Sequence, residues 1–132
     1  PTCFTLGLLH DIGKLILAAH NEKEYSAVLA GALREKVPVY KKELQVYQAT
    51  HADIGAYLLG VWGLPDEIIH AVERHHSSTR DIETKFTPLL CVHVVQNLLP
   101  FSGRIPDLDK DILAQRGFSA RLNSWQDALV NN

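Results

Sequence analysis

Three polar side chains, His10, Asp11 and Lys14, interrupt an apolar run near the start of the chain. A helix that is apolar on all sides is a buried helix, and burying Asp or Lys without a partner is costly. We therefore expect these side chains to be paired, hydrogen-bonded or bound to a metal. His10 and Lys14 share a helix face because they lie four residues apart, and the adjacent Asp11 can reach the same ion.

Other histidines lie where the predicted helices begin or end beside apolar sequence. His20 and His70 have no such companions, and we expect them at the surface. Imidazole and carboxylate ligands together suit Zn, Fe or Mn better than Mg or Ca, which prefer oxygen alone. One expectation is therefore a divalent metal of this kind as cofactor, and the other is a hydrogen-bonded core network without a cofactor. The candidate ligands are His10, Asp11, His51, His75 and His76.

Simpler interpretations stay open for several polar or aromatic residues. Lys14 can form an ion pair with Asp11, three residues earlier. His93 can be a core histidine that is bonded to a neighbouring carbonyl group. Trp62 is expected to be a core anchor rather than part of a binding platform.

Apolar residues at helical spacing, together with helix-boundary residues, predict the elements that position the candidate ligands. The first helix is expected over residues 4–19, and Asn21 can cap the second. Thr50–Asp53 has the pattern of a capping box with Asp in place of Glu, so His51 would open a helix. The helix that follows Pro65 runs out at His75 and His76.

Further helices are expected over residues 38–47, 86–99, 107–114 and from Ser119 onward, with a polar connection over 77–84. Gly55 is unfavourable in a helix interior by about 1 kcal/mol relative to Ala, so we expect it to permit a close helix approach or to leave room beside His51. No segment alternates as a strand does. The pattern predicts an all-α, compact bundle of seven or eight helices.

Length, charge and cysteine content limit the class of protein. The chain has 132 residues, which suits one domain, and a net charge of −2 without a basic block, which disfavours nucleic-acid binding. No uninterrupted apolar stretch predicts a membrane span or a signal peptide. Cys3 and Cys91 have no metal-binding spacing and are expected to be reduced core thiols of a cytoplasmic protein. Because Pro1 leads almost directly into a buried-looking helix, we expect the chain to be cut from a longer one.

The motifs around these residues resemble the HD superfamily and, within it, the HDOD branch. Gly7–Lys14 looks like the motif that gives the superfamily its name. His51–Leu59, followed by Trp62–Pro65, is similar to the HDOD pattern of an H-x-x-x-G-x-x-L-L helix leading to W-x-L-P. Glu43 fits the acidic residue ahead of that helix, and His75-His76 matches the paired histidines that follow it. The resemblance runs from about residue 4 to residue 100.

Active members of the superfamily are metal-dependent phosphohydrolases, so the resemblance implies roles for the candidate residues. His10 and Asp11 would bind the central metal, and His51, His75 and His76 would match additional ligands. Lys14 would contact the substrate phosphate. The chain would be one HD-like helical domain over residues 1–132 that lacks its N-terminal helices.

Three departures from the family pattern argue against hydrolysis. No histidine precedes His10, although the first family ligand should lie a helix or more upstream. Gln96 stands where the family has a late metal-bound Asp. The sequence Ser77–Asp81 does not resemble the R-x-x-G-x-G-Y-P signature of proteins that hydrolyse cyclic di-GMP.

The preferred interpretation is a bacterial, cytoplasmic signal-transduction output domain without catalysis, which contacts a protein partner and is attached to a receiver or sensory domain. Neither nucleic acid nor membrane is expected as a partner. The alternative is a metal-dependent phosphohydrolase that acts on a phosphate ester or nucleotide. A helical scaffold without metal or signalling role is the third interpretation.

Overall fold

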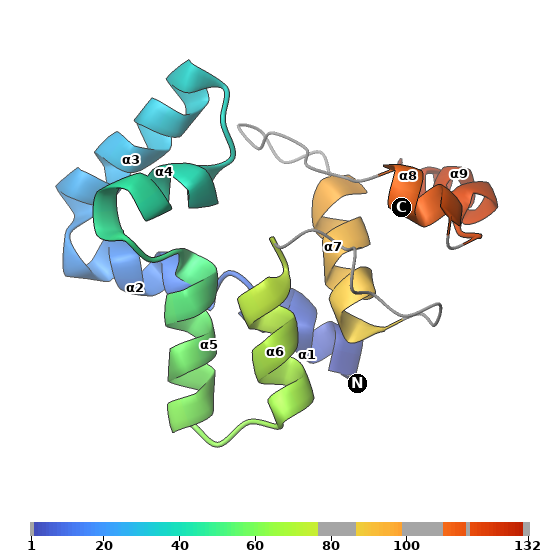
Figure 1. The fold of residues 1–132 in the computed structure, drawn as a ribbon, viewed down its shortest axis with the longest axis horizontal. Coiled ribbons are helices and arrows are strands. Elements are labelled where there is room, and N and C mark those ends of the chain that lie inside the picture. Colours follow the sequence, from blue (N-terminus) through green and yellow to red (C-terminus); the bar gives the residue numbers. More distant parts are fainter. Residues whose placement is uncertain (1, 77–86, 99–109, 116, 131–132) are drawn as a thin grey trace.

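The computed structural model describes residues 2–76, 87–98, 110–115 and 117–130, and the regular structure among them is helical (Figure 1). This confirms the predicted all-α class. The polar connection expected over 77–84 lies outside the described residues. The helices are α1 (Thr2–Leu9), α2 (Ile12–His20), α3 (Glu22–Glu35), α4 (Val39–Tyr47), α5 (His51–Val61), α6 (Asp66–Arg74), α7 (Pro88–Leu98), α8 (Lys110–Gln115) and α9 (Ser119–Val130).

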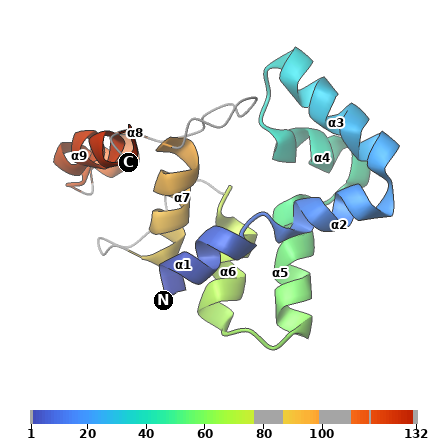
Figure 2. The same cartoon turned by 180° about the vertical axis from the view of Figure 1, so that it is seen from behind.

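The prediction of one continuous helix over residues 4–19 is wrong. The chain bends at His10 and Asp11, which separate α1 from α2 (Figure 2). The Nδ1 atom of His10 lies 2.9 Å from the carbonyl oxygen of Gly7, so this side chain bonds to the last turn of α1. Asp11 is the N-cap residue of α2. The polar pair therefore occupies a corner between two helices rather than the face of one.

Helices α2 and α5 cross at two glycines. A Cβ atom on Gly13 would lie 2.0 Å from the main-chain oxygen of His51, and one on Gly55 would lie 3.3 Å from the Gly13 nitrogen. Only residues without a side chain permit backbones to approach this closely. The expectation that Gly55 allows a close helix approach is confirmed, and the contact brings the start of α2 against the start of α5.

Local capping fixes where two of the helices begin. The Asn21 side chain accepts a hydrogen bond from the Glu24 nitrogen and caps α3. The Thr50 side chain accepts one from the Asp53 nitrogen, and Asp53 accepts one from the Thr50 nitrogen. This is the predicted capping box, and it makes His51 the first residue of α5.

The main core lies between α1, α5, α6 and α7, which pack side by side. Each fully buried aliphatic side chain contributes roughly 1.5–3 kcal/mol relative to an exposed one. Smaller clusters join α2 to α3 and α7 to the C-terminal helices. The residues of the main core that are buried are Leu6, Ala56, Leu59, Ile68, Ala71, Val72 and Val92.

Two predictions about core residues are wrong and one is confirmed. Trp62 is 57% exposed, because α5 ends at Val61 and the chain turns away there through Gly63 at φ 73°. His93 is buried, as expected of a core histidine, and its bond to a carbonyl group stays a prediction. Cys3 is exposed rather than buried. Burial and a hydrogen bond with the Cys3 side chain raise the pKa of the Cys91 thiol to about 11.

The stretch Cys3–His20 is long and apolar enough to cross a bilayer by length and composition alone. Helices that pack in protein cores pass the same test. Here the stretch bends at His10 and Asp11, which differs from one straight spanning helix. The expectation of no membrane partner stays a prediction.

Candidate metal centre

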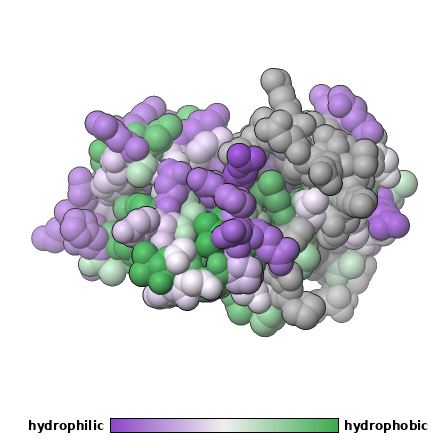
Figure 3. Space-filling view, turned by 60° about the horizontal axis from the view of Figure 1, so that its bottom comes forward, coloured by the Kyte–Doolittle hydropathy of each residue, from purple (hydrophilic) through white to green (hydrophobic). Residues whose placement is uncertain are grey.

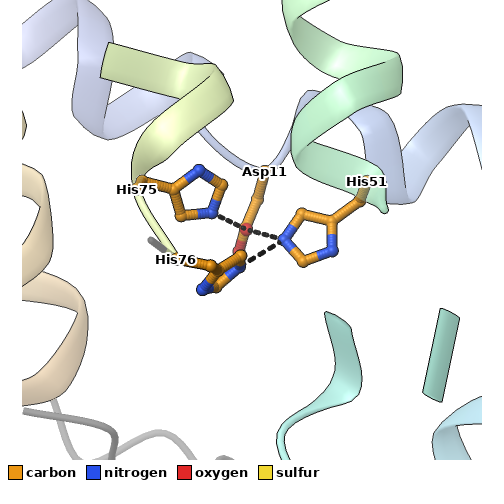
Figure 4. Close-up of side chains that lie close together, drawn as sticks. All are labelled: Asp11, His51, His75 and His76. Carbon is orange, nitrogen blue, oxygen red and sulfur yellow. Dashed lines mark hydrogen bonds and ion pairs between the residues drawn. The ribbon is translucent and has the colours of Figure 1, made fainter. Parts of the chain in front are cut away.

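Four of the five predicted metal ligands converge on one point (Figure 4). One potential ligand atom of each of Asp11, His51, His75 and His76 lies within 4.8 Å of those of the other three. Asp11 Oδ1 is 3.3 Å from His51 Nε2 and 3.8 Å from His75 Nε2. The Nε2 atoms of His51 and His76 are 2.8 Å apart.

Three elements deliver these side chains. Asp11 comes from the corner before α2, and His51 comes from the capped first turn of α5. His75 and His76 follow the last residue of α6, which packs closely against α5. The residues are up to 65 positions apart in the chain, so the crossing of α2 with α5 and the packing of α6 create the cluster.

The hydrogen bonds of two histidines aim a lone pair into the cluster. His51 Nδ1 lies 2.6 Å from a carboxylate oxygen of Glu43, and His75 Nδ1 lies 2.5 Å from the main-chain oxygen of Val72. Both oxygens only accept, so we assign the ring proton of each histidine to Nδ1. Each Nε2 atom then faces Asp11 Oδ1 and is the ring atom through which the histidine would bind a metal.

The electrostatics favour the protonation state that a metal requires at three of the four candidate ligands, Asp11, His75 and His76. Burial alone would raise the pKa of Asp11, but the hydrogen bond with His51 and the charges of Lys14 and His10 outweigh it and hold that pKa well below its usual range. Burial lowers the pKa of His75 to about 3 and also lowers that of His76. Burial would also lower the pKa of His51, but its hydrogen bonds with Asp11 and Glu43 outweigh burial and raise that pKa, so a metal would displace a proton from this ring. At neutral pH the cluster offers an ionised carboxylate and the neutral rings of His75 and His76, which is the form that binds metal.

The spacing of the ligand atoms also fits one transition-metal ion. Two atoms that each lie about 2.1 Å from an ion are roughly 3.0 Å apart at a right angle and roughly 3.4 Å apart at the tetrahedral angle. The separations of 2.8, 3.3 and 3.8 Å bracket these values. The residues present thus fit the expected divalent metal in ligand type and spacing, and Asp11, His75 and His76 fit it in protonation as well.

The structure places the other two predicted site residues beside this group. His10 Nε2 is 3.5 Å from Asp11 Oδ2, on the edge of the cluster. Lys14 Nζ donates a hydrogen bond of 2.8 Å to the same oxygen, which is the ion pair left open by the sequence. A phosphate contact by Lys14 stays a prediction. The predicted departure at Gln96 and the segment Ser77–Asp81 lie outside the described side chains.

Three residues around the cluster, Tyr25, Tyr40 and Glu43, make contacts that the sequence did not reveal. Glu43 is fully buried and accepts hydrogen bonds from Tyr25 and from His51. Tyr40 stacks on His76 with ring centroids 4.5 Å apart. The available signal was the match of Glu43 to the acidic residue that precedes the His51 helix in the family, which gave its position but not its contact with His51.

Fold and site together define an all-α protein with a buried Asp/His cluster of metal-binding type. A family model, the HDOD domain, matches residues 1–78, and the chain belongs to that family. The match includes the cluster and ends before the region around His93 where the resemblance had been extended.

An uncharacterized protein of Treponema pallidum (strain Nichols) is similar to this chain, at 23% identity over 95 residues. The alignment covers 72% of this chain and 18% of that protein, so this chain spans only a small part of its relative's length. No solved structure matches the chain.

Proposed function

We propose that this chain is the regulatory module of a larger signalling protein and that its Asp/His cluster holds one divalent transition metal. The observation that carries the proposal is the convergence of Asp11 Oδ1 with the Nε2 atoms of His51 and His75, whose Nδ1 atoms are bonded elsewhere. Zn, Fe and Mn are the metals that this mixed nitrogen and oxygen set favours.

Burial of the ligands supports a regulatory rather than a catalytic centre. The side chains of His51 and His75 are 1% and 0% exposed, and one oxygen of Asp11 is already bonded to Lys14. Catalytic sites keep a coordination position open, whereas structural sites are closed by protein ligands. A metal in this position would stabilise the junction between α2, α5 and α6 and would make their packing depend on metal occupancy.

The exposed apolar surface supports a protein partner, either an attached receiver or sensory domain or a separate protein. Tyr57, Val61 and Trp62 lie on α5 and the turn after it, and each is more than half exposed. Figure 3 shows hydrophobic side chains among hydrophilic ones on the face where the lower ends of α5 and α6 come forward. Large exposed apolar side chains that cluster are typical of interaction sites.

Elemental analysis of the purified protein tests the metal proposal. We expect near-stoichiometric Zn, Fe or Mn in the wild type and loss of the metal in Asp11→Ala and His75→Ala. The matched control is His70→Ala, which removes an exposed histidine of α6 and should retain the metal. An equal metal content in all four proteins, or none in the wild type, would contradict the proposal.

A photo-crosslinking residue at position 57 of the full-length protein tests the partner proposal. We expect a crosslink to a receiver or sensory domain or to another protein, and none from the same residue at position 23, which is exposed on α3. Equal crosslinking from both positions would show that the α5 surface has no special role.

The second candidate function is a metal-dependent phosphohydrolase, favoured by the position of Lys14 at the partly exposed side of Asp11. A bound metal would supply an activated water and neutralise phosphate charge. Lys14 would hold a substrate phosphate after exchanging its contact with Asp11. Hydrolysis of phosphate esters or nucleotides by the metal-loaded protein, lost in Lys14→Gln with the metal retained, would establish this function. If the metal-loaded protein hydrolyses none of these substrates, the phosphohydrolase function is ruled out and the regulatory proposal remains.

A further inference from the structure

Helix α4 reaches the candidate metal centre through two side chains on one turn. Glu43 contacts His51 by two hydrogen bonds, of 2.8 Å to its main-chain nitrogen and 2.6 Å to its Nδ1 atom. Tyr40, three residues earlier, stacks on His76 with an interplanar angle of 14°. The two side chains thus contact two different candidate ligands.

A residue of α3 holds Glu43 in place. The hydroxyl of Tyr25 donates a hydrogen bond of 2.7 Å to the carboxylate oxygen that His51 does not use. Tyr25 itself is buried between α2 and α3. The result is a continuous chain of hydrogen bonds from Tyr25 through Glu43 to the ring of His51.

The carboxylate of Glu43 is fully buried and depends on the hydrogen bonds that it accepts from His51 and Tyr25. A buried carboxylate that loses its donors is strongly destabilised. Movement of α4 away from α5 would therefore separate a charge from its partners and release the His51 ring at the same time.

Apart from Glu43 and Tyr40, helix α4 packs only weakly against the side of the metal centre. Glu43 is the only residue of α4 that is buried, and apolar residues such as Leu44 and Val46 are about half exposed. Helix α4 packs mainly on α3 and has fewer contacts with α5. The contact of α4 with the rest of the site thus depends on a polar link rather than on an apolar core.

We infer that Glu43, held by Tyr25, is a positioning residue that sets the metal affinity of His51 and couples metal occupancy to the docking of α4. The inference rests on the proposed metal centre and extends it from a binding site to a coupled element. Partners that fix the ring of a metal-binding histidine typically change metal affinity by 10- to 100-fold. Because such coupling is reciprocal, metal binding also holds α4 in place, and a partner that pulls on α4 weakens metal binding.

Metal affinity of defined variants tests the positioning role. Zn²⁺ binding is measured by competition with a chromophoric chelator, and folding is checked by circular dichroism. Glu43→Gln keeps the shape of the side chain but removes its charge, and we expect affinity to fall 10- to 100-fold. Tyr25→Phe removes one hydrogen bond to Glu43 and should lower affinity several-fold. The Tyr25→Phe variant tests the inference if Glu43→Gln does not fold.

The matched control is Glu35→Gln, which makes the same carboxylate-to-amide change on α3. Glu35 is exposed and pairs with Lys42 and Arg34. Zn²⁺ affinity of this variant should stay within about twofold of the wild type. A loss of affinity equal to that of Glu43→Gln would show that any charge on α3 or α4 matters and would overturn the inference.

Hydrogen exchange of the amides in residues 38–48 provides the second readout. We expect Zn²⁺ to slow exchange across α4 in the wild type and to have little effect in Glu43→Gln. A merely structural role would change exchange equally with and without metal. If the wild type binds Zn²⁺ but neither the affinity nor the exchange depends on Glu43 and Tyr25, the coupling is wrong and the metal centre stands. If the wild type and Asp11→Ala both fail to bind Zn²⁺, the metal proposal fails and the coupling fails with it.

Discussion

The substitution Gly13→Ala tests the helix crossing that assembles the candidate metal centre. The added Cβ atom would lie 2.0 Å from the main-chain oxygen of His51, whereas real Cβ contacts are essentially never under 3.0 Å. The two helices must therefore separate by about 1 Å or more, because the obstacle is backbone rather than a flexible side chain. Overpacking of this kind costs about 1–3 kcal/mol, and the better helix propensity of Ala returns about 1 kcal/mol at most.

The matched control for this variant is Gly7→Ala in α1, where an added Cβ atom meets nothing within 4 Å. The control should gain about 0.5–1 kcal/mol from helix propensity. We therefore expect the free energies of unfolding of the two variants to differ by about 2 kcal/mol. With a urea dependence of about 1–3 kcal/mol/M, that difference moves the unfolding midpoint by on the order of 1 M.

Urea unfolding followed by circular dichroism measures the change in stability, and Zn²⁺ competition measures the change in metal affinity. Asp11 Oδ1 and His51 Nε2 are 3.3 Å apart in the wild type, so a shift of about 1 Å in the variant should weaken metal binding by at least about tenfold. Equal urea midpoints for Gly13→Ala and Gly7→Ala would refute the close crossing. A destabilised Gly13→Ala variant with unchanged Zn²⁺ affinity would refute the link between that crossing and the metal centre.

Three further predictions concern a helix cap, a buried histidine and a thiol. Thr50→Ala removes the side-chain cap of α5 and should lower the free energy of unfolding by about 1 kcal/mol, measured by urea titration against the wild type. The folded-state pKa of His75 is lowered to about 3 from its usual 6.5, so the unfolded chain binds more protons between these values. The stability contributed by neutral His75 is therefore lost as pH falls below 6.5, on the order of 2 kcal/mol by pH 4.5, and thermal unfolding of chelator-treated protein should show it. A His75→Gln variant with the same pH dependence would contradict that assignment. The thiol of Cys91, with its pKa raised to about 11, should react with iodoacetamide at pH 8 roughly 100-fold more slowly in the folded than in the urea-unfolded protein, as followed by mass spectrometry. Equal rates would show that the thiol is not protected.

Features that depend on neighbouring residues were predictable from the sequence. The all-α class follows from helical spacing, and the starts of α3 and α5 follow from Asn21 and from the Thr50–Asp53 capping box. The ordered motifs from Gly7 to His76 indicated the HDOD family. These features are local because a helix cap or an apolar face is set by residues within a few positions of one another.

Other features depended on how the helices pack. Helical periodicity treats His10 and Asp11 as part of one helix, and only the structure shows the corner that turns Asp11 toward His51. The exposure of Trp62 likewise depends on how α5 ends and what packs beside it.

The sequence therefore determined which residue types were available for a metal centre, and the tertiary structure decided which of them meet. Asp11, His51 and His75 converge because α2 crosses α5 at backbone contact and α6 packs against α5. Glu43 joins them because α4 carries its buried carboxylate to His51. Such contacts join positions far apart in the chain, and their geometry is set by long-range packing that no local pattern encodes.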